Sequence, residues 1–172
     1  MGDPKRLIAT AGLVALLIGA VACATPVWVG KLRRALREPG QELVALPGKV
    51  ERQYDCDEKK LPFFRLEKSE LNPHRVRPGE ELNHRIVYAM CPESPTEVIE
   101  GTLVTRIRFK GRPIATETLD PFEIKPGRWI VDAFIALPGS AEVGVYAIEL
   151  RFTSETSEIE IDECVTFGVD AG

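Results

Sequence analysis

From residue 62 onward the chain alternates between apolar and polar side chains, the pattern typical of β-strands with one buried face. The clearest case places Tyr146, Ile148, Leu150 and Phe152 on one side of a strand. Runs of the same period cover 82–90, 103–109, 129–135 and 159–169, with a shorter run at 122–124. Pro-Gly and Lys-Gly dipeptides separate them, and no helical period of useful length intervenes. The pattern therefore predicts an all-β, antiparallel sandwich over residues 62–172 and excludes a parallel βαβ sheet.

A five-residue motif refines this fold prediction. Glu142-Val-Gly144-Val-Tyr146 resembles the Asp-x-Gly-x-Tyr signature that opens a late strand in immunoglobulin-like domains. Gly144 and Tyr146 match, Glu142 replaces the aspartate, and Ile148 stands where an antibody domain has its second cysteine. The resemblance implies an immunoglobulin-like sandwich of about seven strands whose tyrosine hydroxyl bonds back to nearby backbone. It implies nothing about a ligand, because this fold serves many functions.

The N-terminal region has the layout of an export signal. Lys5 and Arg6 precede an apolar run, residues 7–30 carry no charge, and Ala20-Val21-Ala22 leads directly to Cys23. This segment resembles a bacterial lipoprotein signal, although Ala20 stands where leucine is usual. The resemblance implies removal of residues 1–22 and attachment of lipid to Cys23.

Two alternatives for this segment remain open. Cleavage at an A-x-A site would release a soluble product, whereas an uncleaved segment is long enough to anchor the chain in a membrane. More basic residues follow the segment than precede it, so the positive-inside rule would place the C-terminal part of an uncleaved chain in the cytoplasm. The basic residues that follow it are Lys31, Arg33, Arg34 and Arg37.

Residues 23–61 are expected to form a tether between the signal and the sandwich. Lys31 to Glu38 has the spacing of a short basic helix, which Pro39-Gly40 would stop. The charged stretch from Glu51 to Lys60 has no clear period and is interpreted as a loop.

The four cysteines form no C-x-x-C pair, which argues against a zinc ribbon, a thioredoxin motif or a haem site. If Cys23 carries lipid, three thiols remain for one disulfide in an oxidising compartment. Cys91 and Cys164 are the expected pair, because both lie near predicted strands. Cys56 is flanked by Asp55, Asp57 and Glu58, which disfavour its thiolate.

The sequence offers few candidates for chemistry. His84 shares a face with Leu82 and Ile86 and is expected at the rim of the sandwich, while His74 follows Asn72-Pro73 in a turn. Neither belongs to a motif for a metal or a nucleophile, so we expect no cofactor and no metal. An acidic stripe (Glu158, Glu160, Asp162) and a basic stripe (Arg106, Arg108, Lys110) are interpreted as solvated faces that could pair across adjacent strands.

These observations favour a non-enzymatic binding or assembly module of the cell envelope, tethered to the membrane and in contact with another envelope protein or a polymer. A net charge of −4 produces no positive electrostatic potential that would attract nucleic acid. No small-molecule substrate is evident from the sequence. The alternatives are a single-pass subunit of an inner-membrane assembly and a hydrolase with a distributed site. Two loops are candidates for the contact surface, one with Pro92, Glu93, Ser94 and Pro95, the other with Pro138, Gly139 and Ser140.

Overall fold

The computed structural model describes residues 40–172. Residues 1–39 lie outside the described part of the chain, so the expectations for the export signal, for lipid on Cys23 and for a helix at Lys31–Glu38 are not addressed by it. The elements are β1 (Gly40–Ala45), α2 (Pro47–Tyr54), the 3-10 turn η1 (Cys56–Glu58), β2 (Phe63–Asn72), β3 (Arg75–Val76), β4 (Glu81–Cys91), β5 (Ile99–Phe109), β6 (Arg112–Ile124), β7 (Gly127–Ala136), β8 (Gly144–Thr153) and β9 (Glu160–Val169).

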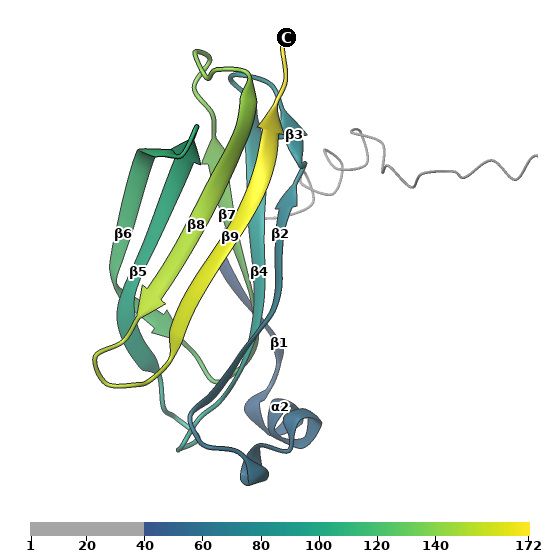
Figure 1. Ribbon diagram of the computed structural model, residues 1–172. Helices are drawn as coiled ribbons and strands as arrows, with labels where there is room; N and C mark the ends of the chain where they lie inside the picture. Colours follow the sequence, from purple (N-terminus) through teal and green to yellow (C-terminus); the bar gives the residue numbers. More distant parts are fainter. Residues whose placement is uncertain (1–39) are drawn as a thin grey trace, which may run out of the picture.

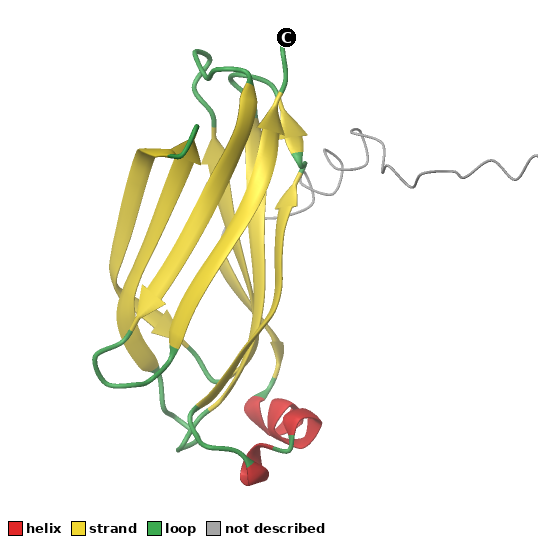
Figure 2. Ribbon diagram, viewed as in Figure 1, coloured by secondary structure: helices red, strands yellow, loops and turns green. Residues whose placement is uncertain are grey.

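These strands form two sheets that pack face to face, as Figures 1 and 2 show. One sheet has the order β1-β7-β4-β2 and the other β3-β9-β8-β5-β6. The pairings are antiparallel except for the short parallel pair β3–β9. The all-β prediction is confirmed, and the helical residues among 40–172 lie at one end of the sheets (Figure 2).

The core forms where the apolar faces of the two sheets meet. Tyr146, Ile148, Leu150 and Phe152 of β8 are all buried, as the alternation along this strand predicts. Two apolar clusters share the interior. One cluster contains Leu82, Phe109, Tyr146 and Phe167, and the other contains Tyr88, Met90, Leu150 and Phe152. Burial of these faces is the main free-energy gain that holds the sheets together.

The predicted domain boundary at residue 62 is wrong, because the segment from residue 40 to residue 61 is already part of the folded domain. Strand β1 pairs with β7, and α2 packs on the outer face of β4 and β7. Val50 of α2 is fully buried there with Ala89 of β4. Val50 is the one buried residue of this eight-residue helix, and Tyr54, one turn later, packs against the same cluster. The interpretation of Glu51 to Lys60 as a loop is therefore wrong for the part that α2 and η1 cover, because two apolar contacts one turn apart are too few to show a helical period.

The disulfide prediction is also wrong. Cys56 of η1 bonds to Cys91 at the end of β4, across a Cα–Cα distance of 6.4 Å, and Cys164 is a free, exposed thiol on β9. Cys91 and Cys164 belong to different sheets, and Cys164 lies opposite Glu149 of β8. Cys91 instead packs with Cys56 and Val50 in the small apolar cluster beneath α2. That cluster brings the two sulfur atoms together.

The motif that suggested the immunoglobulin-like fold forms the expected corner. The hydroxyl of Tyr146 donates a hydrogen bond to the backbone oxygen of Glu142 at 2.9 Å. Its ring stacks between Phe109 and Phe167, with centroid distances of 4.4 and 5.3 Å. Gly144 has φ +151°, and a Cβ at this position would approach the Phe109 ring to 2.8 Å. The motif therefore requires glycine for close packing and tyrosine for the hydrogen bond.

Replacing Tyr146 by phenylalanine is expected to lower the free energy of unfolding by about 1 kcal/mol, because one hydrogen bond is lost while the stacked ring remains. Urea unfolding of the variant and the parent measures the difference. An unchanged near-UV circular dichroism spectrum would show that the ring stays in place. A change below about 0.3 kcal/mol would mean that the corner hydrogen bond does not stabilise the fold.

Candidate functional site

Within residues 40–172, one side of the sandwich is open. At the opposite side β2 lies against β9, and the chain crosses from one sheet to the other between β2 and β3. The open side has β1 at the edge of one sheet and β6 at the edge of the other. Strand β6 forms the outer left edge of the molecule in Figure 1. Edge strands present backbone N–H and C=O groups to solvent and can pair with another chain.

Strand β6 is exposed over most of its length. Residues 112–121 are all exposed, including Ile114 at 57% and Leu119 at 44% of the full residue surface. Its pairing with β5 is regular between Ala115 and Leu119, and irregularities interrupt it on both sides. Pro113 and Pro121 flank this stretch, and proline cannot donate a backbone hydrogen bond. Residues 114–119 therefore lie in the proline-free part of this edge.

The inward-facing side chains of this stretch are not covered by the second sheet. Ala115 lies opposite Ile107 of β5, and Leu119 lies opposite Leu103, and both β5 residues pack into the core. Paired residues in a sheet point to the same face, so Ala115, Glu117 and Leu119 point inward as well. All three are nevertheless exposed. The β6 edge thus extends beyond the four-stranded sheet.

An apolar cleft of about 200 Å³ adjoins this edge, between β6 and the end of β7. Its lining side chains are apolar apart from Tyr146, whose hydroxyl bonds to Glu142. They are Ile107, Ile114, Ala115, Ile135, Ala136, Leu137, Pro138, Ala141, Tyr146 and Phe167. We call the edge stretch 114–119 together with this cleft the open-side site. Among the described strands, β6 has a neighbour on one side only, and the cleft offers space for an apolar side chain.

The structure separates the two loops that the sequence suggested as contact surfaces. Strands β4 and β7 are antiparallel, so the loop after β7 and the loop after β4 lie at opposite ends of the sandwich. Pro138 lines the cleft, and Gly139 and Ser140 follow it on the surface. Pro92 is buried near the disulfide, and Glu93, Ser94 and Pro95 are exposed. Only the Pro138 loop adjoins the open-side site.

The charged stripes lie on the outer face of the five-stranded sheet, except for Glu158, which precedes β9 and pairs with Lys60. They do not pair directly with each other, because β8 lies between β5 and β9. Each pairs with β8 or its loop instead: Arg108 with Glu149 at 2.7 Å, Arg151 with Asp162 at 2.9 Å, and Lys110 with Glu142 at 2.8 Å. Such exposed pairs contribute about 0–1 kcal/mol each. This face is thus a solvated surface with balanced charge.

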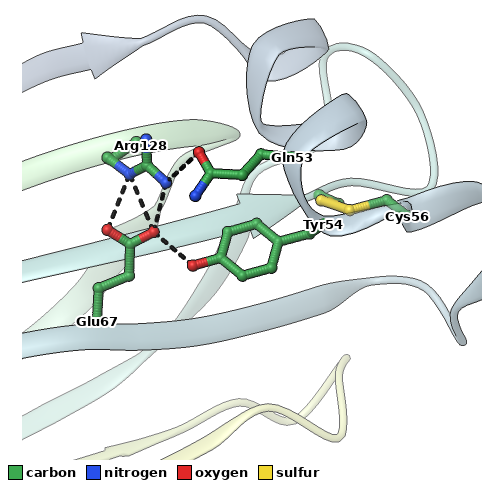
Figure 3. The surroundings of a disulfide bond; sticks show 6 residues. Gln53, Tyr54, Cys56, Glu67 and Arg128 are labelled. Carbon is green, nitrogen blue, oxygen red and sulfur yellow. Dashed lines mark hydrogen bonds and ion pairs between the residues drawn. A yellow bond between two sulfur atoms is a disulfide. The ribbon is translucent and has the colours of Figure 1, made fainter.

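Near the disulfide, a polar cluster attaches α2 to the sheet (Figure 3). Arg128 of β7 binds Glu67 of β2 through Nε and Nη2, at 2.8 and 2.7 Å. Tyr54 donates to the same carboxylate at 2.7 Å, and Gln53 accepts from Arg128 at 2.8 Å. Burial alone would raise the pKa of Glu67, but hydrogen bonds from Arg128 and Tyr54 outweigh it and hold the pKa below its usual value. The contacts indicate a structural role.

His84 lies in the interior, not at the rim that the sequence suggested. The residue is 3% exposed, and its Nε2 lies 3.0 Å from the hydroxyl oxygen of Ser69 on β2. Burial lowers the pKa of His84 to about 4, so the ring is neutral at pH 7. Neither residue lines the open-side cleft or either of the two polar clefts near Lys60 and Glu100. The pair is a buried hydrogen bond between two strands.

Residues 40–172 offer neither a metal-binding cluster nor a membrane-spanning helix. This part of the chain holds no group of three or more His, Cys, Asp or Glu side chains placed to bind a metal ion. It also contains no helix long and apolar enough to cross a membrane.

The alternation of residues in the sequence does not reveal the open-side site. Strand β6 is exposed on both faces, so its apolar residues follow no period of two. The available signal is the stretch between Pro113 and Pro121, in which Ile114, Thr116 and Thr118 have high β propensity.

Comparison with known proteins gives distant structural likeness only. No family model and no curated protein matches the chain. Among solved structures, a family 123 glycoside hydrolase from Clostridium perfringens is 15% identical, with a TM-score of 0.43, over 56% of this chain and 22% of that one. A β-glucosidase from Listeria innocua in complex with glucose is 16% identical (TM-score 0.42), over 64% and 16%. A Niemann-Pick type C2 protein from Japanese carpenter ant is 9% identical (TM-score 0.41), over 63% and 92%.

This chain thus matches less than a quarter of the length of either glycosidase. Likeness at this level carries no information about activity or ligand.

Proposed function

We propose that this protein is a non-enzymatic binding or assembly module of the cell envelope, and that the open-side site is its contact surface. The observation that carries the proposal is the exposed strand edge at residues 114–119, which lies directly beside an apolar cleft. Its partner is another envelope protein or a polymer, and Cys23 carries the lipid that tethers it to the membrane.

The chemistry of an exposed edge supports a binding role. An extended partner segment can add to an edge strand, where main-chain hydrogen bonds give affinity and pockets for alternate side chains give specificity. Soluble proteins usually protect long exposed edges because such edges aggregate. Here Pro113 and Pro121 shorten the exposed edge without covering it, and Ile114 and Leu119 remain accessible. The proline-free stretch between the two prolines therefore limits strand addition to a short segment.

Two features support the fold and location in this proposal. The Cys56–Cys91 disulfide is typical of proteins that mature in an oxidising compartment outside the cytoplasm. The hydrogen bond from Tyr146 to Glu142 supports the immunoglobulin-like form of the sandwich. Sandwiches of this kind often bind through exposed edges or end loops.

The compartment is tested by measuring thiols and the mature N-terminus in protein from the cells that make it. We expect a denatured, unreduced sample to show Cys164 as its single reactive thiol and mass spectrometry to show an acylated Cys23. An intact Met1 together with an oxidised Cys56–Cys91 pair would instead indicate an uncleaved anchor with an exported domain. Four reactive thiols would contradict export.

The contact surface is tested with a photoreactive amino acid at Thr116, in the exposed edge, and at Thr166 as a matched control. Thr166 is an exposed threonine on the same sheet, on the outer face of β9. We expect illumination of intact cells to give a defined adduct from position 116 but not from position 166. The second substitution Ala115→Arg, which fills the cleft, should remove that adduct. Equal adducts from both positions would reject the open side as the surface.

A further inference from the structure

The open-side site also indicates which segment it accepts. We propose that its partner supplies an extended segment with the pattern apolar-x-basic-x-apolar, which adds to β6 as a sixth strand. This inference rests on the proposed function and specifies the chemistry of the partner.

The length and period of the segment follow from β6. Regular pairing with β5 holds from Ala115 to Leu119, and Pro113 and Pro121 stand close to either end. Side chains of an added strand alternate between the faces, so every second one points inward. Three of its inward side chains would then lie opposite Ala115, Glu117 and Leu119. Directly opposed side chains in an antiparallel pair have Cβ atoms about 5 Å apart, close enough to select each other.

The central position calls for a positive charge. Glu117 is exposed and lies opposite Thr105 of β5. The nearby basic residues of β5, Arg106 and Arg108, alternate with inward-facing Ile107 and therefore point to the outer face. Among residues 40–172, Glu117 has no salt-bridge partner. An opposed lysine or arginine would be favourable, and an opposed glutamate unfavourable.

The two outer positions call for apolar side chains. The position opposite Ala115 borders the cleft, whose wall includes Ile135 and Leu137. The position opposite Leu119 meets an aliphatic side chain that is 44% exposed. Covering both removes apolar surface from water at about 25 cal/mol per Å². The order apolar, basic, apolar is the same for either direction of the added strand.

A segment of this same chain has the proposed pattern and is the alternative occupant that the experiment must distinguish from a partner. Leu32-Arg33-Arg34-Ala35-Leu36, which precedes β1, has the same pattern in its sequence. Occupation of the open side by this segment would replace a partner, so the experiment must separate the two cases.

The test measures binding of two extended peptides to the full chain, Thr-Val-Thr-Lys-Thr-Val-Thr and the same sequence with glutamate in place of lysine. We expect the parent protein to prefer the lysine peptide by about twofold to fivefold. Glu117→Lys should invert the preference. The control Glu155→Lys makes the same charge change at an exposed loop residue and should leave the preference unaltered.

The outcomes separate this inference from the proposed function. Inversion by Glu117→Lys but not by Glu155→Lys supports the pattern. Equal changes in both variants, or no binding of either peptide at about 1 mM, overturn it. Tighter peptide binding by an Arg34→Glu variant would identify the chain's own segment as the occupant and also overturn it. If the adduct at Thr116 persists without a charge preference, the binding function stands and this inference alone fails.

Discussion

Replacing Cys56 and Cys91 together by alanine is expected to lower the free energy of unfolding by about 3–4 kcal/mol. The bridge closes a loop with a sequence separation of 35 residues, and its loss restores the conformational freedom of that loop in the unfolded chain. Both cysteines are almost fully buried beneath α2, so alanine also leaves unfilled space there. Urea denaturation of the double variant and the parent measures the difference.

The control for this experiment is Cys164→Ala. Cys164 is free and exposed, so its replacement should change stability by less than about 0.5 kcal/mol. Adding a reductant to the parent should reproduce the loss seen in the double variant, and the same reductant should leave the double variant unchanged. A large effect of Cys164→Ala, or a loss below about 1 kcal/mol in the double variant, would refute the assigned bridge.

The strands that the sequence predicts best are those with one face buried in the core. In β8 and β4 every second residue faces the other sheet, and the resulting alternation is visible without any structure. The Lys-Gly dipeptide that separates two of the predicted runs, Lys110-Gly111, forms a turn for a similarly local reason. Both residues have positive φ, at 51° and 78°, as a tight hairpin turn of this kind requires.

The features that the sequence did not predict depend on contacts between distant segments. Strand β2 contains an irregularity between Leu66 and Lys68 that shifts its alternation, and β6 is exposed on both faces. Cys56 was assigned to a tether, and cysteine spacing alone does not determine connectivity. His84 was assigned to the correct face but to the wrong depth, because alternation gives direction without giving distance from the rim.

The candidate site was predicted only in part, for the same reason. Pro138 lines the cleft because β7 ends beside it, and Gly139 and Ser140 follow on the surface. Pro92 to Pro95 are remote from it because β4 runs in the opposite direction. The edge stretch 114–119 became recognisable only when the strand order placed β6 at the end of its sheet.

Acidification from pH 6.5 to 4.5 is expected to lower the free energy of unfolding by about 2–3 kcal/mol through His84 alone. Burial lowers the pKa of its ring from 6.5 to about 4 in the folded protein, so between these values the unfolded chain binds the proton and the folded chain does not. Stability therefore rises with pH, by about 1.4 kcal/mol per unit where one proton differs. Glu67 also has a lowered pKa, but its contribution is lost at pH values below 4.5, outside this window.

Urea unfolding at several pH values measures this slope, and two variants assign it. His84→Gln should remove most of the slope between pH 4.5 and 6.5, whereas His74→Gln, at an exposed turn, should retain it. If His84→Gln does not fold, a titration of the parent by NMR gives the same information. The imidazole signal of His84 should then show no midpoint near pH 6.5, because protonation would place an unpaired charge between the two sheets. A midpoint near 6.5 would mean that the ring reaches solvent, contrary to its burial against Ser69.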